Sequence, residues 1–212
     1  MQILLINGSP HTGGATDKAL GICERELSSL GASCVRYNIG PSARFACTGC
    51  GGCREGRACV FGDLGELYSL ASSSDGIIIG TPVHFGCAPG TLLSVLSRLL
   101  ISNKAAIDTK PIAAVAVGRR GALSEAASSV LGFFRFTSSV TVNSGYPAIG
   151  FFDKTDGALY DAEGEDNMKR TARNIYALAR GLDIAKQEKA CILDGTGAIR
   201  TDIVTLGKRA LD

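Results

Sequence analysis

The sequence predicts an α/β fold with a doubly wound, five-stranded parallel sheet in the strand order 2-1-3-4-5. Two observations support this prediction. Short apolar runs alternate with helix-length segments along the 212 residues, which is typical of strands joined by crossover helices. The runs are nearly continuous in Ile, Val, Leu and Ala, as expected for strands covered on both faces. Because no linker or internal repeat divides the chain, we expect one domain over residues 1–212.

Each strand and helix is predicted from its own apolar pattern. The expected strands are Gln2–Asn7, Ser33–Ile39, Gly76–Gly80, Pro111–Val117 and Val140–Asn143. The expected helices are Ala15–Leu30, Leu64–Ser73, Gly90–Ser102, Ala122–Phe136 and Glu165–Leu182. The connections 40–62 and 144–164 are unusually long, and long ordered loops in compact domains are often functional. After the last helix, we expect the tail up to residue 212 to form a short hairpin or to pack on a partner.

The composition argues against several classes of protein. The 22 basic and 20 acidic residues leave a net charge of +2, which is too balanced for a protein that binds nucleic acid or a membrane surface. Aromatic residues make up only 6% of the chain and Trp is absent, so a stacking platform for single strands is not expected. The 45% hydrophobic content excludes a disordered chain.

The start of the chain and its cysteines predict a cytoplasmic protein. Met1 leads directly into an apolar run, Ile3–Ile6, without the basic region and cleavage site of a signal peptide. The longest apolar runs, such as Ile112–Val117, are too short to cross a bilayer. We therefore expect the eight cysteines to be metal ligands or free thiols rather than disulfides.

The loop between the first strand and the first helix has the composition of a phosphate-binding loop. Its candidate binding residues are Ser9, His11, Thr12, Gly13, Gly14, Ala15 and Thr16. Glycines allow backbone N–H groups to approach a phosphate closely, and a helix start directs free N–H groups toward the anion. The loop matches neither the Walker pattern nor Gly-x-Gly-x-x-Gly, so a monophosphate such as that of FMN fits better than a pyrophosphate. A plain turn with a Ser or Thr cap is the alternative, and the position at the switch point favours FMN.

Two further loops are expected to reach the same edge of the sheet and to hold the flavin ring. The loop after the third strand contains Thr81, Pro82, Val83, His84, Phe85 and Gly86, and the loop after the fourth contains Gly118, Arg119, Arg120 and Gly121. Backbone amides in these loops would form hydrogen bonds with the nitrogens and carbonyl groups of the flavin ring. An arginine would stabilise the anionic reduced form of the ring. Alternatively, Phe85 belongs to the core, His84 lies on the surface, and the two arginines lie in a solvated turn.

The most specific signal is the cysteine spacing Cys47-x2-Cys50-x2-Cys53-x5-Cys59. Three cysteines at two-residue intervals with a fourth nearby are typical of ferredoxin-like cluster loops, so we predict a [4Fe–4S] cluster. Several glycines in the loop allow tight turns and offer N–H groups to sulfur. The alternatives are zinc, whose cysteine pairs are usually spaced further apart, and four free thiols. Because the loop leaves the carboxyl end of the second strand, we expect the cluster and the flavin on one face, within or between subunits.

The motifs together resemble a known group of proteins. Gly-Ser-Pro followed by Gly-Gly-x-Thr, then Asp75-Gly-Ile-Ile-Ile-Gly-Thr-Pro-Val-His-Phe, then Gly-Arg-Arg-Gly, is similar to the flavodoxin-like NAD(P)H-dependent FMN reductase superfamily over roughly residues 1–150. The cysteine loop makes the chain most similar to the iron–sulfur flavoproteins of that superfamily. Departures from the usual pattern are Ala15 in place of Asn, His84 in place of Tyr, and Ser97-Arg98 in place of Asp-Arg. The resemblance implies an FMN-binding electron carrier that forms homodimers or homotetramers and passes electrons across the dimer interface.

The expected function is electron transfer between a carrier, such as ferredoxin or NAD(P)H, and an acceptor. No general acid or base is required for such a transfer, and no hydrolase-like arrangement of residues stands out. Two alternatives remain open. One is an NAD(P)H-dependent FMN or quinone reductase whose cysteine loop is structural or empty, and the other is a zinc-binding interaction module without flavin.

Overall fold

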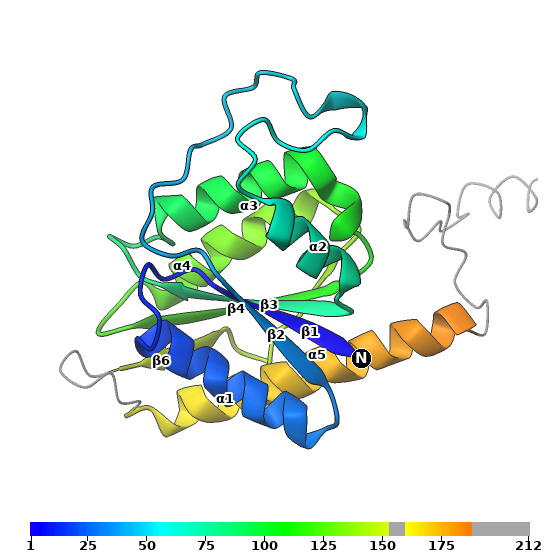
Figure 1. The fold of residues 1–212 in the computed structure, drawn as a ribbon. Coiled ribbons are helices and arrows are strands. Elements are labelled where there is room, and N and C mark those ends of the chain that lie inside the picture. The colour runs from blue at the N-terminus through cyan, green and yellow to red at the C-terminus, as the bar shows by residue number, and fades with distance from the viewer. Residues whose placement is uncertain (153–159, 188–212) are drawn as a thin grey trace, which may run out of the picture.

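The sheet has the predicted strand order. A computed structural model describes residues 1–152 and 160–187 (Figure 1). The strands are β1 (Gln2–Asn7), β2 (Ser33–Asn38), β3 (Gly76–Pro82), β4 (Pro111–Gly118), β5 (Val140–Thr141) and β6 (Ala148–Phe151). They pair in parallel in the order β2-β1-β3-β4-β5, with β6 also paired to β4. The prediction of a doubly wound parallel sheet is therefore confirmed.

The fifth position of the sheet is occupied by two short strands instead of one. β5 pairs with Pro111 and Ile112 at the beginning of β4, whereas β6 pairs with the end of β4, from Val115 to Gly118. Between them, Gly145 has φ of +101° and is followed closely by Pro147, a residue without a backbone donor. The sequence prediction of a single strand Val140–Asn143 followed by a long loop was wrong here, because the four-residue strand β6 lies inside that expected loop.

In the described ranges, five α-helices cover the two faces of the sheet (Figure 1). They are α1 (Ala15–Ser29), α2 (Gly65–Ser73), α3 (Gly90–Asn103), α4 (Leu123–Leu131) and α5 (Ala162–Gln187). The short 3-10 helices are η1 (Arg54–Gly56), η2 (Lys104–Ala106) and η3 (Gly132–Phe136). The expected helix Ala122–Phe136 is thus divided into α4 and η3. α5 begins earlier than predicted, where Asp161 Oδ1 accepts a 2.8 Å hydrogen bond from the Gly164 N–H.

Alternate residues of the central strands point to opposite faces and build two hydrophobic cores. Ile3 and Leu5 of β1 pack with α1 and α5, whereas Leu4 and Ile6 pack with the core formed by α2, α3 and α4. All four side chains are fully buried, which explains why the strand is continuously apolar in the sequence. No helix in the described residues is long and apolar enough to cross a membrane. The tail beyond Gln187, with Cys191, lies outside the described residues.

Cys23 on α1 belongs to the hydrophobic core between the sheet, α1 and α5. Its side chain is inaccessible to solvent, its Sγ lies 3.6 Å from the Met168 carbonyl oxygen, and burial raises its pKa to about 12. Because the thiolate is the reactive form, we expect iodoacetamide at pH 8 to modify Cys23 at least about 100-fold more slowly than the exposed Cys47 of chelator-treated protein. Peptide mass spectrometry over a time course measures both rates. Equal rates would show that α1 does not hold Cys23 in the core.

Candidate functional site

The loop after β1 is held in shape from inside by a buried asparagine. Asn7 is fully buried, and its Oδ1 accepts a 3.0 Å hydrogen bond from the Ser9 N–H. Its Nδ2 donates to the His11 carbonyl oxygen at 3.1 Å and to Asn38 Oδ1 at 3.0 Å. The loop is therefore fixed before any ligand binds. Sequence reasoning missed Asn7, although a polar residue at the end of an apolar strand is a recognisable signal.

The start of α1 offers free backbone donors to this loop. Gly14 is the N-cap residue, and within the described part of the chain no side chain caps the helix. Gly13, at φ of +72°, donates its N–H to Asp17 Oδ2 at 2.8 Å. The alternative of an ordinary turn with a Ser or Thr cap is therefore not what the structure shows. Uncapped N–H groups at a helix start attract anions such as a phosphate.

Two glycines let the chain pack closely beneath the loop. The Gly8 N–H donates to the Gly80 carbonyl oxygen at 2.8 Å and joins the ends of β1 and β3. A Cβ on Gly8 would lie 2.5 Å from Leu92 Cδ2 and 2.7 Å from that same carbonyl oxygen. A Cβ on Gly80 would lie 2.9 Å from both Leu20 and Thr16 on α1. Both positions therefore require glycine.

The three loops predicted to bind FMN meet around one cavity of about 550 Å³, a volume typical of small-molecule sites. It lies at the carboxyl ends of β1, β3 and β4, the edge at which such folds bind their ligands. The predicted residues that line it are Ser9, His11, Gly13, Gly14, Ala15, Thr16, Pro82, Val83, His84, Gly118 and Arg119. Three lining residues were not predicted: Lys18, Val117 and Phe152. For Lys18, a basic side chain one turn after the phosphate loop is the signal that would have identified it.

Six predicted residues do not line this cavity. They are Thr12, Thr81, Phe85, Gly86, Arg120 and Gly121. Thr81 is fully buried, and its Oγ1 donates to the Pro82 carbonyl oxygen at 2.9 Å. Phe85, at φ of +48°, is fully exposed, so the alternative that it belongs to the core is also wrong.

The charge of the cavity suits an anion. His11, Lys18, His84 and Arg119 contribute its titratable side chains, and no acidic residue of the described ranges is part of the lining. Positive groups in a concave site attract and concentrate a negatively charged ligand.

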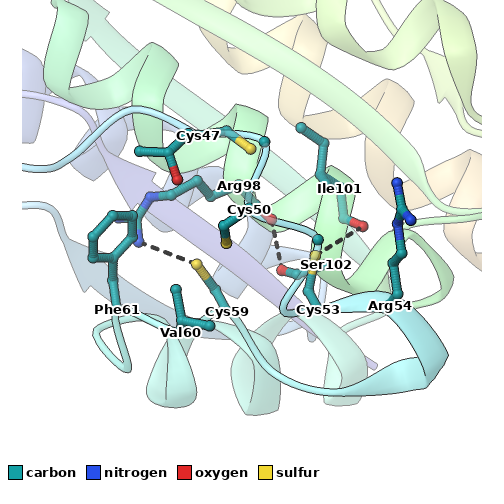
Figure 2. Close-up of a pocket in the computed structure, with 13 residues that line it drawn as sticks. Cys47, Cys50, Cys53, Arg54, Cys59, Val60, Phe61, Arg98, Ile101 and Ser102 are labelled. Carbon is teal, nitrogen blue, oxygen red and sulfur yellow. Dashed lines mark hydrogen bonds between the residues drawn. The ribbon is translucent and has the colours of Figure 1, made fainter.

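The four cysteines of the predicted cluster loop line a second pocket, of about 250 Å³ (Figure 2). The pocket lies between the loop and three residues of α3: Arg98, Ile101 and Ser102. Tight turns shape the loop, with positive φ at Gly49, Gly51 and Gly56, and a Cβ on Gly52 would lie 2.3 Å from Val60 Cγ1.

The chemistry of this pocket fits thiolate ligands. The pKa of the Cys50 thiol is lowered, first by a hydrogen bond with the Gly52 backbone and then by one with Thr48. Arg98 Nη1 lies 3.7 Å from Cys59 Sγ, and Cys53 Sγ lies 4.0 Å from the Ile101 carbonyl oxygen. Among the described residues, no three Cys, His, Asp or Glu side chains lie close enough together to form a metal-binding group. The four sulfur atoms line one pocket, and holding a cluster would require them to come closer together.

An ion pair between the buried Arg98 and the partly exposed Asp63 anchors the cysteine loop to α3. The Arg98 side chain is 1% exposed, and its two Nη atoms donate to Asp63 Oδ1 at 2.5 Å and Oδ2 at 2.7 Å. Arg44 donates to the same carboxylate at 3.1 Å. Hydrogen bonds from Arg98 lower the pKa of Asp63 to about 2. The Arg98 guanidinium also lies 5.3 Å from the Phe61 ring centroid, and Phe61 stacks on Phe45 with 4.9 Å between ring centroids.

The two pockets lie apart within one chain. They share no lining residue among those the structure describes. α3 begins at the carboxyl edge of the sheet and returns toward the amino edge, and the cysteine pocket contacts its second half, from Arg98 to Ser102. The loop leaves the edge where the flavin loops lie, but it folds back over α3 (Figure 1). The expectation that both sites share one face is therefore not met within a subunit.

Comparisons with known proteins identify the family of this chain. The profile of the NADPH-dependent FMN reductase family matches residues 1–154. An iron–sulfur flavoprotein from Methanosarcina thermophila is 28% identical over 182 residues, covering 82% of this chain and 93% of the relative. One from Methanocaldococcus jannaschii has the same identity and coverage. Among solved structures, RosB with bound 8-demethyl-8-formylriboflavin-5′-phosphate aligns with a TM-score of 0.70 at 13% identity, covering 100% of this chain and 86% of that chain.

Because RosB is only 13% identical, its structural likeness supports the fold alone. The family profile, in contrast, matches most of the described residues. On the basis of this profile and of the flavin-type cavity, the chain belongs to the NADPH-dependent FMN reductase family of flavin-dependent oxidoreductases and is similar, within that family, to the iron–sulfur flavoproteins.

Proposed function

We propose that this protein transfers electrons between a redox carrier and an acceptor through FMN and a [4Fe–4S] cluster. The observation that carries the proposal is the gathering of Cys47, Cys50, Cys53 and Cys59 around one pocket, in a chain that also has a flavin-type cavity. FMN would supply one- or two-electron chemistry and the cluster one-electron chemistry. The names of the relatives support both groups.

The residues of the flavin cavity have separate roles in this proposal. Ser9, Thr16, Lys18 and the free N–H groups of α1 would hold the phosphate. The segment from Pro82, at the end of β3, to His84 would hold the ring, together with Gly118 at the end of β4 and Arg119 after it. Arg119 would favour the anionic reduced form by its positive charge. None of these residues needs to act as a general acid or base, because the transfer moves electrons.

The separation of the two pockets bears on the route of electron transfer between the cluster and FMN. Within one subunit the cysteine pocket lies against the second half of α3 and shares no described lining residue with the flavin cavity. Transfer between the cluster of one subunit and the FMN of another, in a homodimer or homotetramer, is therefore the route that we propose. The external donor would be a carrier such as ferredoxin or NAD(P)H.

Cofactor analysis of anaerobically purified protein tests the proposal. We expect about one FMN and about four iron and four sulfide per chain. Flavin without iron would support the alternative of an NAD(P)H-dependent reductase, whose turnover with NAD(P)H and a quinone would survive replacement of all four cysteines. Zinc without flavin would support an interaction module and would overturn the proposal.

A further inference from the structure

A permanent positive charge lies beside one of the four cysteines. Arg98 Nη1 is 3.7 Å from Cys59 Sγ, and Figure 2 shows the guanidinium directed at that sulfur atom. The same Nη1 is 2.5 Å from Asp63 Oδ1. One guanidinium therefore links a candidate cluster ligand to a carboxylate.

The surroundings keep this charge fixed and desolvated. A guanidinium does not deprotonate in proteins, and hydrogen bonding to Asp63 raises the pKa of Arg98 further. The side chain is 1% exposed, and the Phe61 ring packs against it, with the Phe45 ring stacked on Phe61. Charges act on one another more strongly where water is excluded than in bulk solvent.

Asp63 partly offsets this charge and is less buried. Its side chain is 25% exposed and also accepts a hydrogen bond from Arg44. The carboxylate therefore keeps a cationic partner when Arg98 is changed. The Arg98 cation next to Cys59 and the Asp63 carboxylate bound to it can therefore be removed one at a time.

We propose that the Arg98–Asp63 pair sets the reduction potential of the cluster that Cys59 would help to hold. The inference rests on the proposed function. Reduction adds one electron to the cluster, supplied by an external reductant, and neither forms nor breaks a bond to Arg98. The added negative charge is stabilised by the cation at the ligand sulfur and opposed by the carboxylate beyond it. Arg98 thus raises the potential and Asp63 limits the increase.

Anaerobic redox titration of the holoprotein tests this assignment, with the cluster followed by electron paramagnetic resonance and the flavin by visible absorbance. Arg98→Gln is expected to make reduction of the cluster about tenfold less favourable, which is 59 mV for one electron. Asp63→Asn is expected to shift the cluster potential in the opposite direction. Arg98→Lys retains the charge and should lie closer to wild type than Arg98→Gln.

The flavin potential of the same molecules is the internal control, because neither residue lines the flavin cavity. A purely structural role would move both variants in the same direction or not at all. Shifts of the same sign, or shifts below about threefold in the reduction equilibrium, would overturn the assignment while leaving the proposed function intact. If Arg98→Gln does not fold, Asp63→Asn and Arg98→Lys decide the question. Wild-type protein without a cluster signal would overturn the proposed function itself and this inference with it.

Discussion

Replacing Gly8 by alanine is expected to weaken FMN binding by at least about 100-fold and to lower the free energy of unfolding by about 1–3 kcal/mol. The added Cβ would lie 2.7 Å from the Gly80 carbonyl oxygen, a backbone atom that cannot rotate away. It would also break the 2.8 Å hydrogen bond that joins β1 to β3 directly beneath the phosphate loop. Urea unfolding and fluorescence titration of apoprotein with FMN measure the two effects.

Gly65→Ala is the matched control for this change. Gly65 is the first residue of α2, and a Cβ there would meet no atom within 4 Å among those the structure describes. We expect its FMN affinity to equal that of wild type and its stability to be unchanged or slightly higher. If Gly8→Ala bound FMN as tightly as Gly65→Ala does, the packing described for the β1 and β3 ends would be contradicted.

Replacing Cys50 by serine is expected to remove nearly all iron and sulfide while FMN affinity stays within about twofold of wild type. A serine hydroxyl does not ionise near neutral pH and does not replace a thiolate ligand. FMN should be unaffected because Cys50 is not among the residues that line the flavin cavity. Iron, sulfide and flavin analysis of anaerobically prepared protein measures the result.

Cys34→Ser is the control for the loss of a cysteine elsewhere. Cys34 lies in β2, away from both pockets, and its half-buried thiol has a pKa raised to about 11 by burial. This variant should retain the wild-type iron content. Full iron content in Cys50→Ser, or equal losses in both variants, would mean that the loop does not hold the cluster through Cys50.

The arrangement of the strands could be predicted from the sequence because the local apolar pattern agrees with the tertiary structure. β1, β3 and β4 are buried on both faces, so their apolar runs are continuous and easily recognised. β6 was missed because four residues, one of them Gly150, give too short a pattern to distinguish from a loop. Its existence depends on the free edge at the end of β4, which is a tertiary property.

The site was only partly predictable for a similar reason. Glycines and hydroxyl residues after β1 mark the phosphate loop because they act locally, and 11 of the 17 predicted flavin-site residues line the cavity. The pairing of Arg98 with Asp63 joins residues 35 positions apart and follows from the packing of the loop on α3. That packing also carries the cysteines away from the flavin edge, which strand order alone did not reveal.

Counting the electrons that each chain accepts tests most directly whether one protein holds both redox groups. Anaerobic titration of purified protein with dithionite should consume about three electrons per chain, about two by FMN and about one by the cluster. Cys50→Ser protein should consume about two, all of them accounted for by flavin bleaching. Wild-type protein that takes up only about two electrons per chain, with no absorbance change beyond that of flavin, would contradict the account.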